Sequence, residues 1–576
     1  MQLLVLPEWG LHGLPPELTS NLTSPDTADL QHRLYTAYTE QLPGCAGRTG
    51  CCFPARVSVR RVRVCEAAPG ESLYERLHLR MACIARAYRI ALLFNMGERL
   101  PASGRQYNTN VLFDARGCLQ LRYRKRHLLN EFLFDVPDAP EDSDAHPVAV
   151  FESAELGRVA AVVCFDIESP RVTQELAARV DTLLLPVAWT DYGLLDPLLS
   201  YRYHAAIAAR LGINLLVANL HNPENYMGSS GIYAPDGPRA LHCSVNRSAE
   251  STLLVADVPL SPRLQRERRA AAKCTAHQQQ SRLKHDNSAA APKRANDKCV
   301  VVHEEYDRSA KSAQMQARYL EGSSLVYRFD PLEHHCVKAC YAGLCCRVRI
   351  DLSPEPTASP AAGELLELEV AGDVVDNYGD MSPTDREHRY QWCRLSRADE
   401  VTHHDHKCAL DCPTPTAHLP EHMPLVPELD LTAVPNTNLS LSAPNDTLDD
   451  LFADESALKV SNSSASANVT ASRLSSRLSY ISLSGNFSGF VFPSLLVADP
   501  RGRLLPHYRA VRVSLNHMRL QYRLEPDEAG RLAIHSASLF ARLYEHDVHH
   551  VRSDRSARNG SRPLQRNHTS PLQYHQ

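Results

Sequence analysis

Short apolar runs alternate with helix-like segments throughout the first 261 residues, and this alternation constrains the fold more than any other feature of the sequence. Segments of the two kinds that follow one another in turn favour an α/β fold with layered sheets. Strands are expected at 3–6, 57–64, 90–94, 110–114, 119–123, 159–165, 182–187 and 214–219. Helices are expected at 27–41, 71–88, 170–180 and 197–211. A chain of 576 residues also exceeds the size of a single core, so further domains are expected to follow.

Three of the expected strands end at residues with reactive side chains. The run LLVLPEWG delivers Glu8, LQLRYRKRHLL delivers Lys125, and GRVAAVVCFDIESP delivers Cys164. In α/β sheets, ligands meet the backbone at the carboxyl ends of strands, so the three side chains are candidates for one site. Taken alone, Cys164 also fits a buried core cysteine, because free cysteine is often simply buried.

A carboxylate, an ammonium and a thiol together supply nucleophilic catalysis on a carbonyl compound. The carboxylate takes the thiol proton as a general base and returns it to a leaving amine. The ammonium lowers the pKa of the thiol and stabilises an oxyanion. The thiolate attacks the carbonyl carbon and becomes acylated. The ordered set of Glu8, Lys125 and Cys164 therefore indicates this chemistry more strongly than any one of the residues does.

The same residues lie in motifs that resemble those of the nitrilase superfamily of carbon-nitrogen hydrolases, in its biotinidase and vanin (pantetheinase) branch. Pro7-Glu8 matches the PE motif after the first active-site strand, RYRK at Arg122–Lys125 matches the lysine motif, and CFDI at Cys164–Ile167 matches the nucleophile motif. Further matching stretches are Gln106–Asp114, Leu183–Thr190, Gly231–Pro235, Gly343–Cys346 and Leu483–Leu496.

The resemblance implies a nitrilase-like α-β-β-α sandwich over residues 1–261, followed by a smaller, disulfide-rich, β-dominated domain over 301–550. The basic residues 262–300 are expected to form a linker, 413–479 a glycosylated insertion, and 551–576 a disordered tail. Family members carry a signal peptide, a strand and a helix before the PE motif. The first domain is therefore expected to be incomplete at its amino terminus, with the signal peptide absent from this sequence.

By resemblance, the chain is expected to be a secreted amidohydrolase that cleaves a linear, non-peptide carboxamide. The implied substrates are pantetheine, which gives pantothenate and cysteamine, or biotinyl amides such as biocytin. Glu8 is the implied general base and acid, and Cys164 is the implied nucleophile, which forms a thioester. Lys125 and a backbone N–H near Cys164 are implied to hold the oxyanion, and neither a metal nor an organic cofactor is expected.

Four further residues are candidates for supporting roles. Glu131 follows the lysine and resembles the second glutamate of many superfamily members, although a solvated loop carboxylate fits equally well. Trp189 and Tyr233 follow or lie in apolar stretches and fit either a pocket wall or the core. His204, in the alanine-rich stretch YRYHAAIAARL, can face the pocket, but core packing is the favoured interpretation.

One departure from the family pattern lies beside the nucleophile. The branch has a longer segment between CFDI and the next proline, whereas Glu168 and Ser169 lead directly to Pro170 here. A backbone shift of about 1 Å beside a nucleophile can lower the rate roughly 100-fold. The alternative function is therefore a catalytically inactive secreted glycoprotein that uses the fold as a binding scaffold.

Cysteines and glycosylation sequons favour an oxidising, extracellular compartment. The chain has 17 cysteines, so an even number remains to pair once Cys164 is set aside. The competing interpretation is a zinc site, because the run HHDHKC at 403–408 contains metal-ligand types, but the irregular cysteine spacing favours disulfides. Sequons begin at Asn21, Asn246, Asn438, Asn445, Asn462, Asn468, Asn486, Asn559 and Asn567.

The expected partner is a small-molecule amide. A formal net charge of −4 gives no indication of a nucleic-acid partner. No apolar run reaches the roughly 18 residues that span a membrane, and no hydrophobic tail of a lipid anchor closes the sequence. The sequence does not indicate an oligomeric state.

Overall fold

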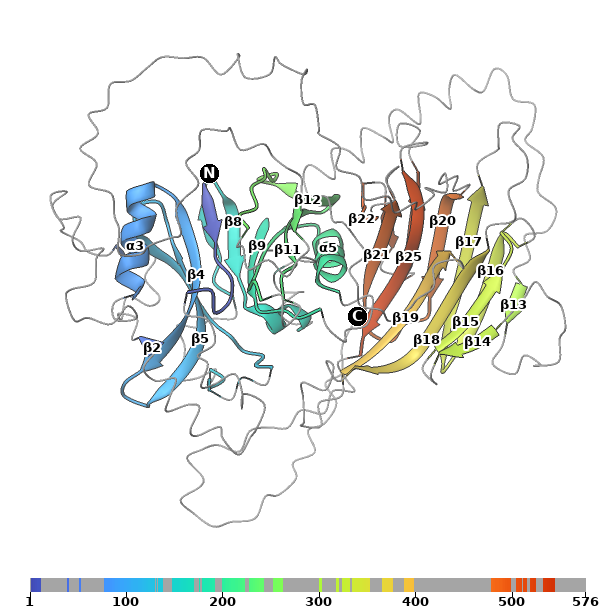
Figure 1. Cartoon of the computed structure of the whole chain (residues 1–576), viewed down its shortest axis with the longest axis horizontal. Helices are drawn as coiled ribbons and strands as arrows, with labels where there is room; N and C mark the ends of the chain where they lie inside the picture. Colours follow the sequence, from blue (N-terminus) through green and yellow to red (C-terminus); the bar gives the residue numbers. More distant parts are fainter. Residues whose placement is uncertain are drawn as a thin grey trace, which may run out of the picture.

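The computed structural model describes two bodies, an α/β domain and a domain of strands (Figure 1). In the first part of the chain it describes residues 2–11, 39–40, 51–52, 77–129, 131, 133–137, 148–169, 176, 179–191, 199–222, 227–242 and 252–262. In the second part it describes residues 300–302, 317–320, 324–331, 334–352, 365–376, 388–397, 478–498, 504–509, 511–514, 518–524 and 532–543.

The first sheet of the α/β domain has its strands in the order β1, β4, β5, β6 and β3, with β2 beside β4. Their bounds are β1 Leu3–Val5, β2 Thr39–Glu40, β3 Cys51–Cys52, β4 Ala91–Leu100, β5 Arg105–Phe113 and β6 Cys118–Arg124. β1 is parallel to β4, whereas β4, β5 and β6 pair antiparallel. Helix α3 (Leu77–Tyr88) covers one face, where Met81 lies in a hydrophobic cluster with Phe94 and Phe113.

The second sheet has its six strands in the order β12, β11, β10, β9, β8 and β7. Their bounds are β7 Phe151–Ser153, β8 Gly157–Ala161, β9 Thr182–Val187, β10 Asn214–Asn219, β11 Ser230–Ala234 and β12 Gly237–His242. The central strands β8, β9 and β10 are parallel. Helix α5 (Ser200–Leu211) packs against this sheet.

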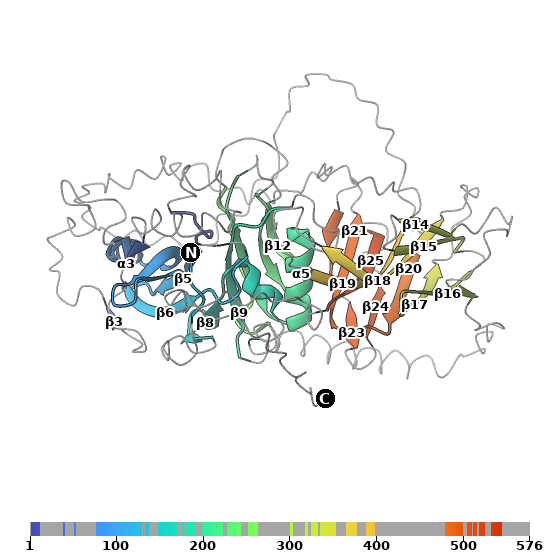
Figure 2. The ribbon, with the colours of Figure 1, turned by 90° about the horizontal axis from the view of Figure 1, so that it is seen from below.

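Strand β4 shows how the layers are held together. Successive side chains of a strand point to opposite faces. Leu92 and Phe94 belong to the cluster beneath α3, whereas Ala91 and Leu93 belong to the cluster that also contains Leu183 of the second sheet. The layers therefore follow the order α3, first sheet, second sheet and α5, as Figure 2 shows. This is the nitrilase-like α-β-β-α sandwich expected from the sequence.

The carboxy-terminal domain contains two antiparallel-rich sheets. One has the order β13 (Val300–Val302), β16 (Cys336–Tyr341), β17 (Leu344–Leu352), β20 (Leu478–Gly485), β24 (Arg519–Arg523) and β23 (Arg512–Ser514). The other has the order β14 (Ala317–Leu320), β15 (Ser324–Phe329), β18 (Leu366–Asp376), β19 (His388–Arg397), β25 (Ala533–Arg542), β21 (Phe490–Ala498) and β22 (Leu504–Pro506).

Disulfides hold this second domain, as expected from the sequence. Cys340 and Cys345 close the turn between β16 and β17, and Cys346 and Cys393 join β17 of one sheet to β19 of the other. Cys336 is also disulfide-bonded. The run at 403–408, on which the zinc interpretation depended, lies outside the described residues.

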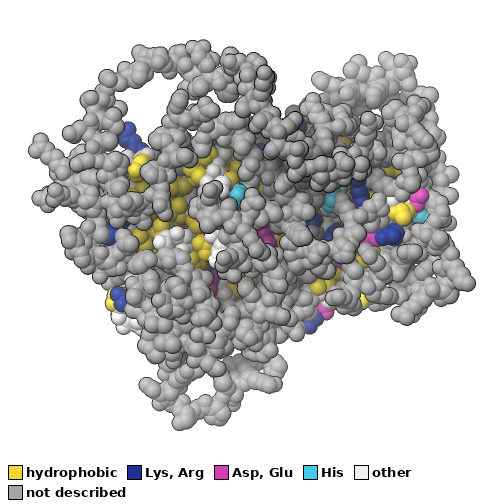
Figure 3. Space-filling model, in the orientation of Figure 1, with side chains coloured by type: hydrophobic (Ala, Val, Ile, Leu, Met, Phe, Trp, Pro, Cys, Tyr) yellow, Lys and Arg dark blue, Asp and Glu magenta, His cyan; other side chains and the backbone are white. Residues whose placement is uncertain are grey.

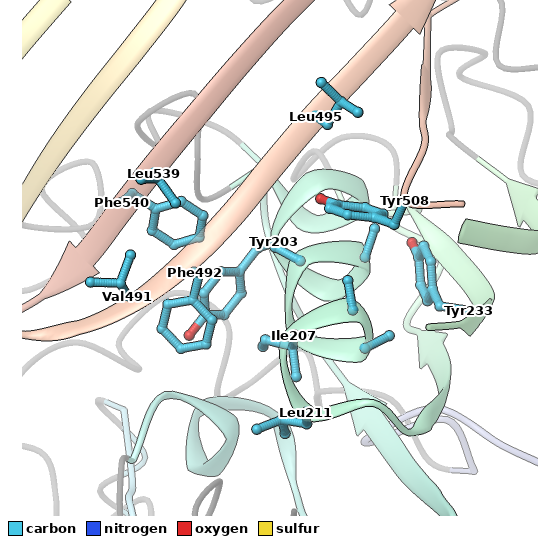
Figure 4. Packing of buried hydrophobic residues seen from close by; sticks show 14 of the residues in the cluster. Tyr203, Ile207, Leu211, Tyr233, Val491, Phe492, Leu495, Tyr508, Leu539 and Phe540 are labelled. Carbon is cyan, nitrogen blue, oxygen red and sulfur yellow. The ribbon is translucent and has the colours of Figure 1, made fainter. Parts of the chain in front are cut away.

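Helix α5 forms the interface between the two domains by packing on β21 (Figure 4). The ring of Tyr203 lies 5.6 Å from that of Phe492 and 5.8 Å from that of Phe540, measured between centroids. Arg210 Nε donates a hydrogen bond to the Val491 carbonyl oxygen at 3.0 Å. One buried hydrophobic cluster extends from the α/β domain into the carboxy-terminal domain.

Two sequence-based expectations about the elements need correction. The expected helix at 27–41 is wrong at its end, because Thr39 and Glu40 form β2 and pair with Gly97 and Glu98 of β4. The pairing partner is distant in sequence, so a local pattern does not show it. The expected strand at 159–165 ends early, because β8 stops at Ala161 and a 3-10 helix begins at Cys164.

Several other expectations lie outside the described residues. They are the strand at 57–64, most of the helix at 170–180, residues 263–299 of the linker, residues 413–477 of the insertion, and the tail at 551–576. In the described part of the chain, no helix is both long and apolar enough to cross a membrane.

Candidate active site

The chain leaves β1 through a tight turn that buries Glu8. Within this turn, the Gly10 N–H donates to the Pro7 carbonyl oxygen at 3.1 Å, and Trp9 has a left-handed backbone with φ of 61°. The Trp9 N–H donates to Asn95 Oδ1 at 3.2 Å, which ties the turn to β4. The Glu8 side chain is consequently held in the interior, with only 1% of its surface exposed.

Donors from both sheets converge on the Glu8 carboxylate. Asn108 Nδ2, from β5, lies 2.7 Å from Oε1, and Lys125 Nζ, just beyond β6, lies 2.9 Å from the same atom. The Ala188 N–H, just beyond β9, donates to Oε2 at 2.9 Å. Hydrogen bonds to an ionised group are stronger than neutral ones, so this set fixes both the position and the orientation of the carboxylate.

A ladder of buried asparagines connects Glu8 to the backbone that leads into Cys164. Asn95 Nδ2 donates to Asn108 Oδ1 at 2.6 Å and to Asn110 Oδ1 at 3.0 Å. Asn110 Nδ2 then donates to the Val162 carbonyl oxygen at 2.9 Å. Sequence reasoning did not assign these asparagines a role. The signal was present in QYNTNVLFD, where three consecutive polar residues, Asn108–Asn110, lead directly into the apolar residues of an expected strand.

Lys125 lies between two carboxylates. Its N–H donates to the Asn108 carbonyl oxygen at 2.8 Å, and its Nζ contacts both Glu8 and Glu131. Burial by itself lowers the pKa of a lysine, but the charges of Glu131, Glu8 and Cys164 outweigh it and hold the pKa of Lys125 well above its ordinary value. The ammonium therefore stays charged inside the domain.

Glu131, a supporting candidate from the sequence, lies beside the lysine rather than in solvent. Its Oε1 contacts Lys125 Nζ, while its buried Oε2 has no hydrogen-bond partner among the described residues. Burial raises the pKa of Glu131 to about 8, with Glu8 adding to the increase and Lys125 opposing it. Two carboxylates share one ammonium here, so Glu131 holds a proton more readily than an ordinary glutamate does.

Cys164 begins a short 3-10 helix, Cys164–Glu168, which we call the nucleophile turn because the sequence predicts Cys164 to be the nucleophile. Val162 remains attached to the sheet, because its N–H donates to the Leu184 carbonyl oxygen at 3.1 Å. The φ of Cys164 is +44°, an uncommon conformation for a residue with a side chain. Such outliers cluster at functional sites. Cys164 is the free cysteine of the described residues, and it is buried.

The charges of Glu8 and Lys125 both act on the Cys164 thiol. Burial raises the pKa of this thiol well above its ordinary value, and Glu8 raises it further. Lys125 and the N–H of Ala188 lower it but do not outweigh burial. The expectation that the ammonium lowers the pKa of the thiol is correct for the contribution of Lys125 and wrong for the net effect. The resting sulfur is protonated, so thiolate formation requires an adjacent base.

Asp166 joins the nucleophile turn to the segment that follows Lys125. Its Oδ1 accepts the N–H of Arg126 at 3.1 Å and the N–H of His127 at 2.8 Å. Its Oδ2 accepts the Val163 N–H at 3.3 Å. Asp166 is fully buried and lies within the CFDI motif, yet sequence reasoning gave it no separate role.

The remaining supporting candidates form a buried aromatic cluster. The ring of Trp189 lies 5.2 Å from that of His204 in an edge-on arrangement, and the ring of Tyr233 lies 6.4 Å from that of His204. Burial lowers the pKa of His204 to about 3, so this side chain is neutral. His204 therefore matches the core-packing interpretation. Trp189 contributes to the site through its backbone. Its N–H donates to Asn219 Oδ1 and its carbonyl oxygen accepts Asn219 Nδ2, and these bonds fix the backbone next to Ala188, whose N–H donates to Glu8.

Asn486 is the predicted glycosylation residue that the structure describes. It is exposed, its Oδ1 accepts the Cys345 N–H at 2.5 Å, and its Nδ2 donates to the Gly343 carbonyl oxygen at 3.2 Å. The other predicted glycosylation residues lie outside the described residues: Asn21, Asn246, Asn438, Asn445, Asn462, Asn468, Asn559 and Asn567.

Glu8, Lys125 and Glu131 form a group of charged side chains in the buried site. On the face shown in Figure 3, the charged side chains of the described residues lie scattered rather than in a single patch. Within the described ranges, no group of three or more His, Cys, Asp or Glu side chains could hold a metal ion.

Comparison with known proteins gives one family. The carbon-nitrogen hydrolase family matches residues 1–263. The chain is 38% identical over 196 residues to pantetheinase of Mus musculus, an alignment that covers 32% of this chain and 36% of that protein. It is 37% identical over 195 residues to pantetheine hydrolase VNN2 of Homo sapiens, with the same two coverages. It is 30% identical over 275 residues to biotinidase of Takifugu rubripes, which covers 45% of this chain and 47% of that protein.

These alignments span less than half of the curated relatives' own length. The family match at residues 1–263 spans the α-β-β-α sandwich that holds Glu8, Lys125 and Cys164. Residues 1–263 therefore match the carbon-nitrogen hydrolase family, and the chain is similar in sequence to pantetheinases and biotinidases.

Proposed function

We propose that this chain is an amidohydrolase that cleaves a linear, non-peptide carboxamide through a thioester on Cys164. The observation that carries the proposal is the convergence of one carboxylate and one ammonium on a buried, protonated, free thiol. The charges of Glu8 and Lys125 both reach the Cys164 thiol, and Glu8 is itself held by Asn108, Lys125 and the Ala188 N–H. A weak nucleophile is activated by a base that a third group orients in this way.

In the first half-reaction, Glu8 takes the thiol proton while Sγ of Cys164 attacks the amide carbon. The electron pair of the C=O bond moves to oxygen, and Lys125 with a backbone N–H near Cys164 stabilises that oxyanion. When the tetrahedral intermediate collapses, the C–N bond breaks. Glu8 returns its proton to the departing amine, so the products of this half are a free amine and a thioester.

In the second half-reaction, Glu8 takes a proton from water and the resulting hydroxide attacks the thioester carbon. Collapse of this intermediate breaks the C–S bond, and the carboxylic acid leaves. The proton on Glu8 returns to Sγ, which restores the resting thiol. The balance is one amide and one water consumed for one acid and one amine released.

Glu131 is proposed to support the site by holding Lys125. Because its pKa is raised to about 8, it is mostly protonated at neutral pH and leaves the ammonium charge available to the oxyanion. A fully ionised Glu131 would add a second negative charge beside Glu8 and would disfavour the thiolate further.

The proposed substrates are pantetheine or biotinyl amides such as biocytin, because relatives at 30% to 38% identity are named pantetheinase and biotinidase. Secretion of a glycosylated protein is supported by the sequons and by the disulfides of the second domain. The short segment between Ile167 and Pro170 is the observation that favours the second candidate, an inactive binding scaffold.

The test measures cysteamine release from pantetheine and biotin release from biocytin by the full chain, secreted from eukaryotic cells behind a leader. The informative variants are Cys164→Ala and Glu8→Gln. The matched control is Glu152→Gln, because Glu152 is an exposed carboxylate on β7. We expect turnover of one substrate that Cys164→Ala and Glu8→Gln abolish and the control retains. A folded, glycosylated wild type without turnover of either substrate would favour the scaffold.

A further inference from the structure

The far end of the nucleophile turn is held by the other domain. Glu168, its last residue, is only 2% exposed. Its Oε2 accepts the Tyr390 hydroxyl at 3.3 Å and Arg542 Nε at 3.4 Å. Both donors belong to the carboxy-terminal domain, in β19 and β25, so a carboxylate four residues after the nucleophile has its charge compensated from across the domain interface.

The two donors are themselves rigidly placed. Tyr390 and Arg542 are paired neighbours in the register of β19 and β25, in the interior of a sheet. The guanidinium of Arg542 lies 5.0 Å from the centroid of the Tyr390 ring, and its Nη1 donates to the Arg389 carbonyl oxygen at 3.3 Å. Arg542 is 3% exposed along its side chain, so water does not compete strongly for Glu168.

The nucleophile turn is short enough to transmit this constraint to the reacting atoms. Within it, the Asp166 N–H donates to the Val163 carbonyl oxygen at 3.0 Å, and the Ser169 N–H donates to the Asp166 carbonyl oxygen at 3.1 Å. Asp166 also bonds the segment after Lys125, as described above. A movement of Glu168 therefore changes where the thiol and the backbone N–H groups of the turn point relative to Lys125.

We propose that Arg542 and Tyr390 are positioning residues, through which the carboxy-terminal domain holds the nucleophile turn and sets the reactivity of Cys164. The carboxy-terminal domain is in this respect a part of the active site. The Tyr390 hydroxyl and Arg542 anchor the far end of this turn at Glu168. The expected change in kcat rests on the proposed function, whereas the expected change in the alkylation rate of Cys164 does not.

The experiment compares Arg542→Gln and Arg542→Lys with wild type in the full, secreted chain. The matched control is Arg210→Gln, which removes another arginine of the same interface that bonds the Val491 carbonyl oxygen and not the nucleophile turn. Two quantities are measured: the rate at which iodoacetamide alkylates Cys164 under native conditions, followed by peptide mass spectrometry, and kcat and KM for the amide substrate.

In Arg542→Gln we expect alkylation and kcat both to fall about tenfold or more, because the displaced thiol loses the groups that favour its thiolate. KM should change much less, Arg542→Lys should recover part of both rates, and Arg210→Gln should stay near wild type. Equal behaviour of Arg542→Gln and Arg210→Gln would overturn the inference. So would faster alkylation in Arg542→Gln, because the second domain would then only shield the thiol.

Two further readouts keep the inference testable. If Arg542→Gln does not fold, Tyr390→Phe removes only the hydroxyl that donates to Glu168 and must reproduce a smaller decrease in alkylation. An unchanged rate in that variant contradicts the inference. If wild type hydrolyses no amide, the proposed function fails, but the alkylation rates still decide whether the second domain positions Cys164.

Discussion

Acidification should weaken the α/β domain through His204, which lies in the middle of helix α5 with none of its surface exposed. Neither ring nitrogen has a hydrogen-bond partner among the described residues, and the ring packs against Trp189 and Tyr233. Burial without a partner disfavours the charged imidazolium, and it lowers the pKa of His204 from 6.5 to about 3.

The sign and the size of the effect follow from this shift. The folded pKa lies below the unfolded one, so the unfolded chain binds a proton that the folded chain does not between about pH 6.5 and about pH 3. The contribution to stability is complete above that window and is lost as the pH falls through it. At pH 5, about 1.5 units below the unfolded pKa, the expected loss is about 2 kcal/mol.

The assay is urea unfolding at about pH 7.5 and about pH 5, followed by tryptophan fluorescence, for wild type and His204→Leu. Leucine keeps an apolar side chain of similar volume but cannot take up a proton. Wild type should lose about 2 kcal/mol more than the variant on acidification. The matched control is His335→Leu, because His335 is exposed. An equal pH dependence in wild type and His204→Leu would refute the reasoning, since His204 would then be protonated without penalty.

Three further predictions concern the site and the second domain. Asn108→Asp should lower kcat at least tenfold, because an ionised carboxylate replaces the amide that donates to Glu8 and cannot make that hydrogen bond. Asn108→Ala adds no charge, so its kcat should fall less. Steady-state kinetics compare the two variants. Glu131→Gln should become more stable relative to wild type as the pH rises from about 5 to about 8. The folded pKa of Glu131 is raised to about 8, so in this window the unfolded wild type releases a proton that the folded wild type keeps, and wild type loses stability. Thermal unfolding measured across this pH range tests this, and parallel curves for the two proteins would contradict it. Replacing both Cys346 and Cys393 by Ala should lower the free energy of unfolding by up to about 4 kcal/mol, because the disulfide closes a loop with a sequence separation of 47, and a loss near zero in denaturant unfolding would contradict this.

Local pattern was sufficient to single out three candidate residues that the structure brings together in one buried site. Each of Glu8, Lys125 and Cys164 stands where an apolar or alternating run ends, and such runs are visible in sequence because strand periodicity and burial act over a few neighbouring residues. The same periodicity predicted most of the described strands of the α/β domain. It failed at Thr39 and Glu40, whose strand depends on an edge of β4 that no local pattern reveals.

The sequence by itself therefore determined the fold class and indicated the candidate reacting groups, since these depend on short-range hydrophobic patterns and on motif residues. Only the tertiary structure decided how those groups behave. The net pKa shift of Cys164 depends on burial and on charges from separate strands. The contact between Glu168 and Arg542 joins residues 374 positions apart. Such effects are set by distances between distant segments, and those distances exist only after the sheets and the two domains have packed together.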